Sequence, residues 1–156
     1  MPHLQVIFAS TSGHTEYVVR TLADALKTNA PEWTVDLKRA EESSADDLLK
    51  GDALLLASST WNTGGAEGQL NPHMYLFLNN KAKDIDLKGK KVALIALGDH
   101  RYFYQAGAAG HLEEFVSKHG GAMLLPTLKI INEPYGQEKD VLDWSKKLAA
   151  SLSLKA

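Results

Sequence analysis

The sequence predicts an α/β protein: a three-layer, doubly wound sheet of five parallel strands in the order 2-1-3-4-5. Two observations predict this fold. Strand-like and helix-like segments alternate along the whole chain, and three of the strand-like segments are nearly unbroken apolar runs. Such runs are typical of strands that helices cover on both faces. With 156 residues, the chain is expected to form a single domain over residues 1–156, long enough to bury a core without disulfides.

The three apolar runs are expected in the centre of the sheet, and the other two strand-like segments at its edges. The central runs are Leu4–Ala9, Ala53–Ser58 and Lys91–Leu97. Apolar and polar residues alternate in Thr34–Lys38, so one of its faces is expected to meet solvent. Met123–Ile131 contains a proline and a lysine, which a sheet tolerates at an edge. With right-handed crossovers, two edge strands in these positions give the order 2-1-3-4-5.

Helical patterns fill the intervals between these strands. The expected helices are Thr15–Thr28, Pro72–Ala82, Gly107–His119 and Gln137–Leu154. The first and the last place apolar residues along one face, as helices that pack on a sheet do. Asn71 is a typical N-cap, and a proline suits the first helical position that follows it. A short helical turn is expected over Ala45–Lys50.

Composition excludes several classes of function. The chain has no cysteine, which excludes disulfides, thiolate nucleophiles and cysteine-ligated metals, so any redox chemistry must come from a bound cofactor. The net charge of −2, with acids and bases interspersed, provides no basic stripe for nucleic acid. No apolar run reaches membrane-spanning length and no leader precedes the first strand, so we expect a cytoplasmic protein without a membrane partner. The histidines share no ligand spacing, and no metal site is expected.

The segment Ser10–Thr15 lies where the first strand gives way to the first helix. In the predicted fold, ligands bind beyond the carboxyl ends of strands one, three and four. The hydroxyls and the glycine of this segment suit a tight turn that directs N–H and O–H groups at an anion, in front of a helix N-terminus. A Walker-type loop would need an earlier glycine and a lysine, and both are absent. The segment therefore predicts a phosphate monoester that is held and not transferred; an ordinary polar loop is the alternative.

Aromatic residues follow the two other central strands. The third strand ends in a glycine-containing loop with Trp61, and the fourth ends in a loop with Tyr102. These rings could simply plug the upper edge of the sheet. Their positions on separate loops that flank one crevice better suit a flat aromatic ligand held between them. A phosphate at one end and a planar ring at the other describe flavin mononucleotide (FMN).

The chain resembles the short-chain flavodoxins over nearly its whole length. The matching segments are Ser10–Thr15, Ser59–Trp61, Asp86–Val92, Gly98–Asp99 followed by Tyr102 and Tyr104, and Ile130–Trp144. Each segment is weak evidence alone, but their order and spacing together are specific. The resemblance implies a flavodoxin-like fold that binds FMN non-covalently.

The resemblance also implies which residues form the cofactor site. The phosphate would be enclosed by Ser10, Thr11, Ser12, Gly13, His14 and Thr15. The inner ring face and its N5 edge would be lined by Thr60, Trp61, Asn62 and Thr63, with Ser59 and Gly64 beside them. The outer face and the pyrimidine edge would be held by Asp99, Tyr102, Tyr104 and Ala106. The carbonyl of Asn62 would turn toward N5 during reduction.

A low-potential one-electron carrier is the function that the resemblance implies, with FMN between Trp61 and Tyr102. The protein would not be an enzyme. It would be a monomer, and it would shuttle electrons between redox partner proteins, a reductase and an acceptor. The alternative is an FMN-dependent NAD(P)H or quinone reductase on the same fold, with room for a second substrate beside the exposed loop 64–68. Trp61 over the ring argues against that alternative. A third class, a cofactor-free receiver module, would need paired acids after the first strand, which are absent.

The sequence departs from the family in its charges near the flavin. His100 and Arg101 immediately precede Tyr102, in a family that usually rings the flavin with carboxylates. Fewer anions reduce the electrostatic penalty on reduced flavin. We therefore expect a reduction potential less negative than is usual for the family.

Overall fold

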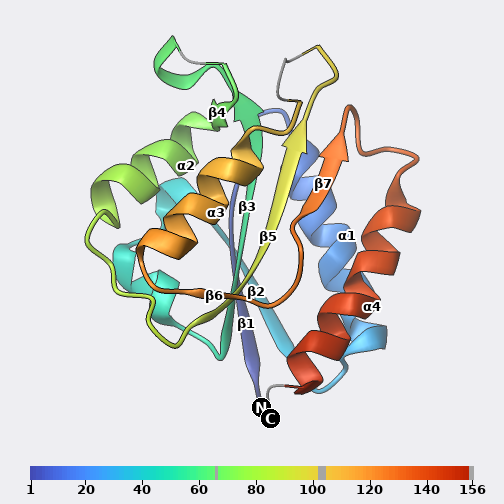
Figure 1. Cartoon of the computed structure of the whole chain (residues 1–156). Helices are drawn as coiled ribbons and strands as arrows, with labels where there is room; N and C mark the ends of the chain where they lie inside the picture. The colour runs from blue at the N-terminus through green and yellow to red at the C-terminus, as the bar shows by residue number, and fades with distance from the viewer. Residues whose placement is uncertain (66, 102–104, 155–156) are drawn as a thin grey trace.

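The computed structural model describes residues 1–65, 67–101 and 105–154. A sheet lies at its centre, with helices on both faces (Figure 1). The helices α2 (Pro72–Leu76) and α3 (Ala108–Lys118) cover one face, and α1 (His14–Asn29) and α4 (Glu138–Leu154) cover the other. This arrangement confirms the predicted three-layer α/β fold. None of the helices in these ranges is both long enough and apolar enough to cross a membrane.

The strand order also agrees with the prediction. The strands are β1 (His3–Ala9), β2 (Thr34–Arg39), β3 (Ala53–Trp61), β4 (Gln69–Leu70), β5 (Lys91–Gly98), β6 (Ala122–Met123) and β7 (Leu128–Ile131). The path runs β2-β1-β3-β5-β6, with every neighbouring pair parallel. β7 also pairs with β5 in parallel, so β6 and β7 share the fifth position. The predicted order 2-1-3-4-5 is therefore confirmed, with β2 and the β6/β7 position at the edges.

The fifth strand was expected to be continuous and is instead interrupted. β6 pairs with Lys91 and Val92, whereas β7 pairs with the other end of β5, Ile95–Gly98. Pro126 lies between the two pieces and has no N–H to donate to a ladder. Its carbonyl accepts a hydrogen bond from Trp144 Nε1 of α4 at 3.0 Å. The edge strand thus bends away from the sheet at the proline, which is tied to the helix instead.

The antiparallel strand β4 was not expected. Gln69 and Leu70 pair with Trp61 and Thr60, which extends β3 three residues beyond the predicted Ser58. The connecting loop is closed by Thr63, whose hydroxyl donates to the carbonyl of Leu70 at 2.5 Å. A strand of two residues is too short to show an alternating pattern, so it could not be predicted from the sequence.

The helix predicted over Pro72–Ala82 is α-helical only in its first part. Asn71 caps it as expected, because its side-chain oxygen accepts the N–H of His73 at 2.9 Å. A π-helical turn follows over Phe77–Lys81 (η4), and the N–H of Ala82 reaches the carbonyl of Phe77 at 2.9 Å. The wider turn leaves both Phe77 and Leu78 buried in the core. Packing on the sheet therefore decides the form of this helix.

The core consists of two layers, one on each face of the sheet. Within β3, Leu55 and Ala57 pack with α1 and α4, whereas Leu54 and Leu56 pack with α2 and α3. All four side chains are fully buried. Burial on both faces explains why the central strands are apolar without alternation.

A buried carboxylate fastens the β2 edge. Asp47 lies in the 3-10 turn Ala45–Leu49 (η2), where a helical turn was predicted, and its side chain is 2% exposed. It accepts hydrogen bonds from the Lys38 ammonium at 3.0 Å, the Lys50 ammonium at 2.8 Å and the Ser44 N–H at 2.8 Å. Burial alone would raise the pKa of Asp47, but the hydrogen bonds from Lys50, Ser44 and Lys38 outweigh it and hold the pKa well below its usual range.

We predict that Asp47→Asn weakens the dependence of stability on acid. A carboxyl whose pKa is depressed on folding stabilises the protein above its unfolded pKa of about 3.9, and this stability is lost as pH falls toward the folded pKa. At pH 7 the variant should lose about 1–3 kcal/mol of unfolding free energy. Urea unfolding between pH 7 and pH 2 measures both effects. The neighbouring exposed Asp46→Asn is the control, and equal pH slopes for Asp47→Asn and wild type would contradict the prediction.

Candidate functional site

A cavity lies where the carboxyl ends of β1, β3 and β5 meet, at the upper edge of the sheet in Figure 1. Its volume is about 660 Å³, within the usual range for small-molecule sites. The residues that line it are Ser12, His14, Ser59, Thr60, Trp61, Leu97, Gly98, Asp99, His100, Arg101, Asn132 and Glu133. Six of the predicted site residues are among them: Ser12, His14, Ser59, Thr60, Trp61 and Asp99. Three loops distant in sequence therefore meet around one cavity.

The turn Ser10–Thr15 leads directly into α1, which begins at His14, one residue before the predicted start. Gly13 is the N-cap and has a φ of 93°, in the left-handed region that glycine adopts without strain. The hydroxyl of Ser10 accepts the N–H of Glu16 at 3.2 Å. The earlier N–H groups of a helix have no acceptor within the helix itself. The turn therefore presents backbone donors and the positive end of the α1 dipole.

The hydroxyl of Thr15 tests whether a phosphate fits this turn. The side chain is 1% exposed, and its oxygen has no hydrogen-bond partner among the described residues. Buried polar groups are paired in the large majority of cases, so such an oxygen calls for an explanation. A phosphate oxygen held at the N-terminus of α1 would supply the partner. The donors present, hydroxyls and N–H groups without a lysine, fit a phosphate monoester.

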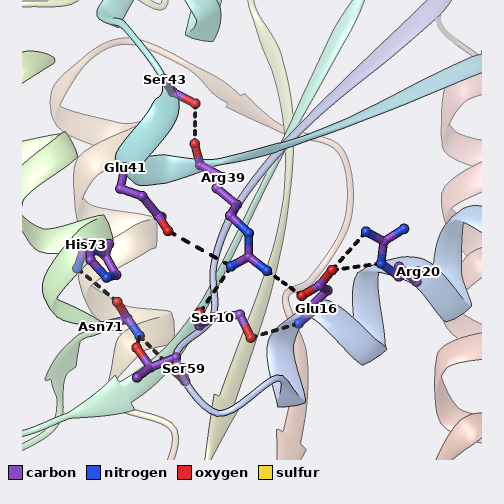
Figure 2. Close-up of polar contacts among 10 residues, drawn as sticks. Ser10, Glu16, Arg20, Arg39, Glu41, Ser43, Ser59, Asn71 and His73 are labelled. Atoms are coloured by element: carbon purple, nitrogen blue, oxygen red, sulfur yellow. Dashed lines mark hydrogen bonds and ion pairs between the residues drawn. The ribbon is translucent and has the colours of Figure 1, made fainter.

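Two residues outside the predicted site form hydrogen bonds with the Ser10–Thr15 turn (Figure 2). The amide nitrogen of Asn71 donates to the Thr11 hydroxyl at 3.0 Å and lies 3.4 Å from the Ser59 hydroxyl. Arg39 donates from Nη1 to the carbonyl of Ser10 at 3.3 Å. Asn71 was recognisable in the sequence as a helix cap, but not as a link between two loops. Nothing in the sequence pattern pointed to Arg39.

The loop after β3 places its aromatic residue at the cavity. Trp61 is half-buried, and its indole N–H donates to the hydroxyl of Ser59 at 2.7 Å. The hydroxyl of Thr60 is used inside the fold, because it donates to the carbonyl of Leu97 at 2.7 Å and accepts the N–H of Ala108 at 3.2 Å. Trp61 is therefore the residue of this loop that is available to cover a planar ligand.

The end of this loop lies farther from the cavity. The carbonyl of Asn62 accepts the N–H of Gly65 at 2.9 Å, so any turn of that carbonyl would break this bond. Gly64 has a φ of 70° within the tight turn Thr63–Gly65 (η3). Asn62, Thr63 and Gly64 are not among the described residues that line the cavity. Their predicted contacts with the ring stay predictions.

The loop after β5 carries an ion pair at the cavity. Arg101 donates from Nε to one oxygen of Asp99 at 2.9 Å and from Nη2 to the other at 2.6 Å. These hydrogen bonds from Arg101 lower the pKa of Asp99 to about 2, so this carboxylate is ionised at neutral pH. Of the other predicted residues here, Tyr102 and Tyr104 lie outside the described residues. Ala106 is buried and does not line the cavity.

Asn132 closes the cavity from the end of β7 and was missed by the sequence analysis. Its N–H donates to the carbonyl of Gly98 at 2.8 Å, and its side-chain oxygen accepts the N–H of His100 at 3.0 Å. Its φ of 69° is one that asparagine tolerates better than most residues. An asparagine directly after the last strand was the available signal. Among the described residues, no group of three or more side chains could hold a metal ion.

Comparisons with known proteins agree on one family. The Flavodoxin family model matches residues 6–144. The flavodoxin of Maridesulfovibrio salexigens is 32% identical over 145 residues, which cover 92% of this chain and 94% of that protein. The probable flavodoxin 2 of Bacillus subtilis is 30% identical over 145 residues, covering 91% and 90%. The crystal structure of oxidised flavodoxin 2 from Bacillus cereus matches with a TM-score of 0.82 at 30% identity and covers 99% of both chains.

We predict that Gly98→Ala disrupts the cavity where the end of β5 lines it. A Cβ at this position would collide with the backbone carbonyl of Gln105, which accepts the N–H of Asp99 at 3.1 Å. The variant should lose about 1–3 kcal/mol of unfolding free energy in urea titrations. Gly110→Ala is the matched control, because a Cβ there meets nothing within 4 Å and an alanine in a helix stabilises by about 0.5–1 kcal/mol. A Gly98→Ala variant as stable as wild type would contradict the prediction.

Proposed function

This chain belongs to the flavodoxin family, and from that premise we propose that it holds FMN with its phosphate in the Ser10–Thr15 turn and its ring between Trp61 and Tyr102. Its function is electron transfer: it is an FMN-binding electron carrier and not an enzyme. This role implies partner proteins that donate and accept electrons. A reductase as donor, a separate acceptor protein, the monomeric state and the cytoplasmic location stay predictions from the sequence.

The buried hydroxyl of Thr15 carries the proposal for the phosphate. It lies in the first turn of α1 without a partner among the described residues. Ser12, also in the Ser10–Thr15 turn, lines the cavity. A phosphate at this position would accept hydrogen bonds from hydroxyls and N–H groups and would meet the positive end of the helix dipole. The turn would thus hold the charge of the phosphate with dipoles that the fold has already oriented.

Trp61 and the loop after β5 support the proposal for the ring. Bound FMN supplies the redox chemistry, since it accepts and gives single electrons. The indole of Trp61, held by Ser59, would exclude water from one face of the ring. Tyr102 lies outside the described residues, so its place on the other face rests on the sequence. Asp99 and Arg101 neutralise each other at the rim of the same cavity.

The assigned function predicts one-electron exchange without turnover of a nicotinamide. Purified protein loaded with FMN should be reduced anaerobically by dithionite and should then pass electrons to an added one-electron acceptor, such as a haem protein. The same sample should show no steady-state oxidation of NADH or NADPH in the absence of other proteins. Steady nicotinamide oxidation would instead support the reductase alternative, which the family match and the similar proteins do not support. Failure to retain FMN would contradict the proposed site.

We predict that Thr15→Val lowers FMN affinity without destabilising the protein lacking FMN. Valine has nearly the shape of threonine, and it removes a buried oxygen that lacks a partner among the described residues. Unfolding free energy without FMN should therefore stay equal or rise by up to about 1 kcal/mol. The dissociation constant for FMN, measured by quenching of flavin fluorescence, should rise about tenfold or more.

Thr21→Val is the control for that substitution. Its hydroxyl also lies on α1, but it donates to the carbonyl of Tyr17 at 2.8 Å, away from the turn. FMN affinity should be the same as wild type in this variant. If Thr15→Val and Thr21→Val bound FMN equally well, the buried hydroxyl would have no role in holding the phosphate.

A further inference from the structure

Arg39 is the last residue of β2, and the sheet fixes the route of its side chain. In the register of the parallel pair, Arg39 lies opposite Phe8 of β1. Its guanidinium carbon lies 5.3 Å from the centroid of the buried Phe8 ring, within the range of a cation–π contact. The hydroxyl of Ser43 donates to the Arg39 carbonyl at 2.8 Å, which anchors the backbone as well. The Arg39 side chain is 32% exposed and crosses from the sheet edge to the N-terminus of α1.

The guanidinium contacts the first residue of the phosphate turn and the residue that directly follows the turn (Figure 2). Nη1 donates to the carbonyl of Ser10, the first residue of the turn, at 3.3 Å. Nη2 donates to the carboxylate of Glu16, in the first turn of α1, at 2.5 Å. Arg20 donates to the same carboxylate from Nε at 2.9 Å but makes none of the described contacts with Ser10. Arg39 is therefore placed to fix the backbone of the turn, and Arg20 is not.

Because the peptide bond is planar, the contact between Arg39 and the Ser10 carbonyl also affects the N–H of Thr11. In a trans peptide the carbonyl oxygen and the following N–H point in opposite directions. A Ser10 carbonyl held by Arg39 therefore directs the N–H of Thr11 to the side of the turn away from the guanidinium. The Thr11 hydroxyl is held separately by Asn71. Backbone and side chain of Thr11 are thus oriented by two different residues.

We propose that Arg39 is a positioning residue for the phosphate site: it fixes the Ser10–Thr11 peptide so that the N–H of Thr11 faces the phosphate of FMN. The proposal rests on the proposed function. Arg39 would act through backbone orientation, because its charge is compensated locally. Its guanidinium lies beside Glu16 and 4.0 Å from Glu41. The hydrogen bond from Arg20, with further contributions from Arg39, lowers the pKa of Glu16, so Glu16 is ionised at neutral pH.

Riboflavin, which lacks the phosphate, separates this role from a general loss of structure. We expect Arg39→Gln to raise the dissociation constant for FMN about tenfold, which corresponds to about 1.4 kcal/mol. The dissociation constant for riboflavin should change less than about twofold, because the ring site is intact. Equal weakening of both ligands would overturn the proposal, since it would show a general loosening of the fold. Wild-type protein that bound neither ligand would instead overturn the proposed function.

Arg20→Gln is the matched control for charge. It removes an equal positive charge from Glu16 but leaves the carbonyl of Ser10 in contact with Arg39. FMN affinity should change less than about twofold in this variant. If Arg20→Gln weakened FMN as much as Arg39→Gln, the charge and not the orientation would matter, and the proposal would be wrong.

Arg39→Lys keeps the positive charge, and it serves if Arg39→Gln does not fold. A lysine has no planar fork with which to hold Ser10 and Glu16 together. Its dissociation constant for FMN should rise about threefold, and that for riboflavin should stay at the wild-type value. The order parameter of the Thr11 N–H, measured by NMR without flavin, should be lower in this variant than in wild type. An unchanged order parameter together with unchanged FMN affinity would overturn the proposal.

Discussion

The structure depends on a sheet that is buried on both faces. The side chains of β3 and β5 pack alternately against α1 with α4 and against α2 with α3, and nearly all are apolar. Polar groups therefore have little room except at the ends of the strands, where the chain turns into loops. Because β1, β3 and β5 are parallel, their carboxyl ends lie at one edge. Three polar loops are thereby forced together, and the cavity between them follows from the topology.

At this edge, the proposed phosphate would be held by oriented dipoles and not by charged side chains. The Ser10–Thr15 turn contains no lysine or arginine, and the guanidinium of Arg39, which contacts the turn, is engaged by two carboxylates and a carbonyl. What remains for a phosphate is a set of dipoles: the hydroxyls of the turn and the N–H groups at the start of α1. Dipoles act only when they point correctly, whereas a charge acts from any direction. The contacts of Arg39 and Asn71 behind the turn therefore matter as much as the turn itself.

A feature of this structure could be predicted from the sequence where neighbouring residues in the chain determine it. Continuous apolar runs mark β1, β3 and β5 because helices cover both faces of these strands, and Asn71 with a following proline marks the start of α2. Pro126 was a local signal for the interrupted fifth strand, whereas β4 and the π-helical turn have none, because they depend on a two-residue pairing and on the packing of Phe77. In the site, the predicted loops meet as expected. Arg39 reaches the site from β2 and could not be found by reading each loop alone, whereas Asn132 directly follows the last strand and could have been found from that position.

The pairing of Asp99 with Arg101 determines how Arg101 can affect the redox potential of the flavin. From the sequence, Arg101 is a cation beside the flavin that would favour the reduced form. In the structure, both oxygens of Asp99 are bound by that guanidinium, so the pair presents a dipole and little net charge. A less negative potential would then come from the small net charge of the chain, −2, and not from Arg101 as an isolated cation. Because the two side chains are bound to each other, they act on the potential as a unit.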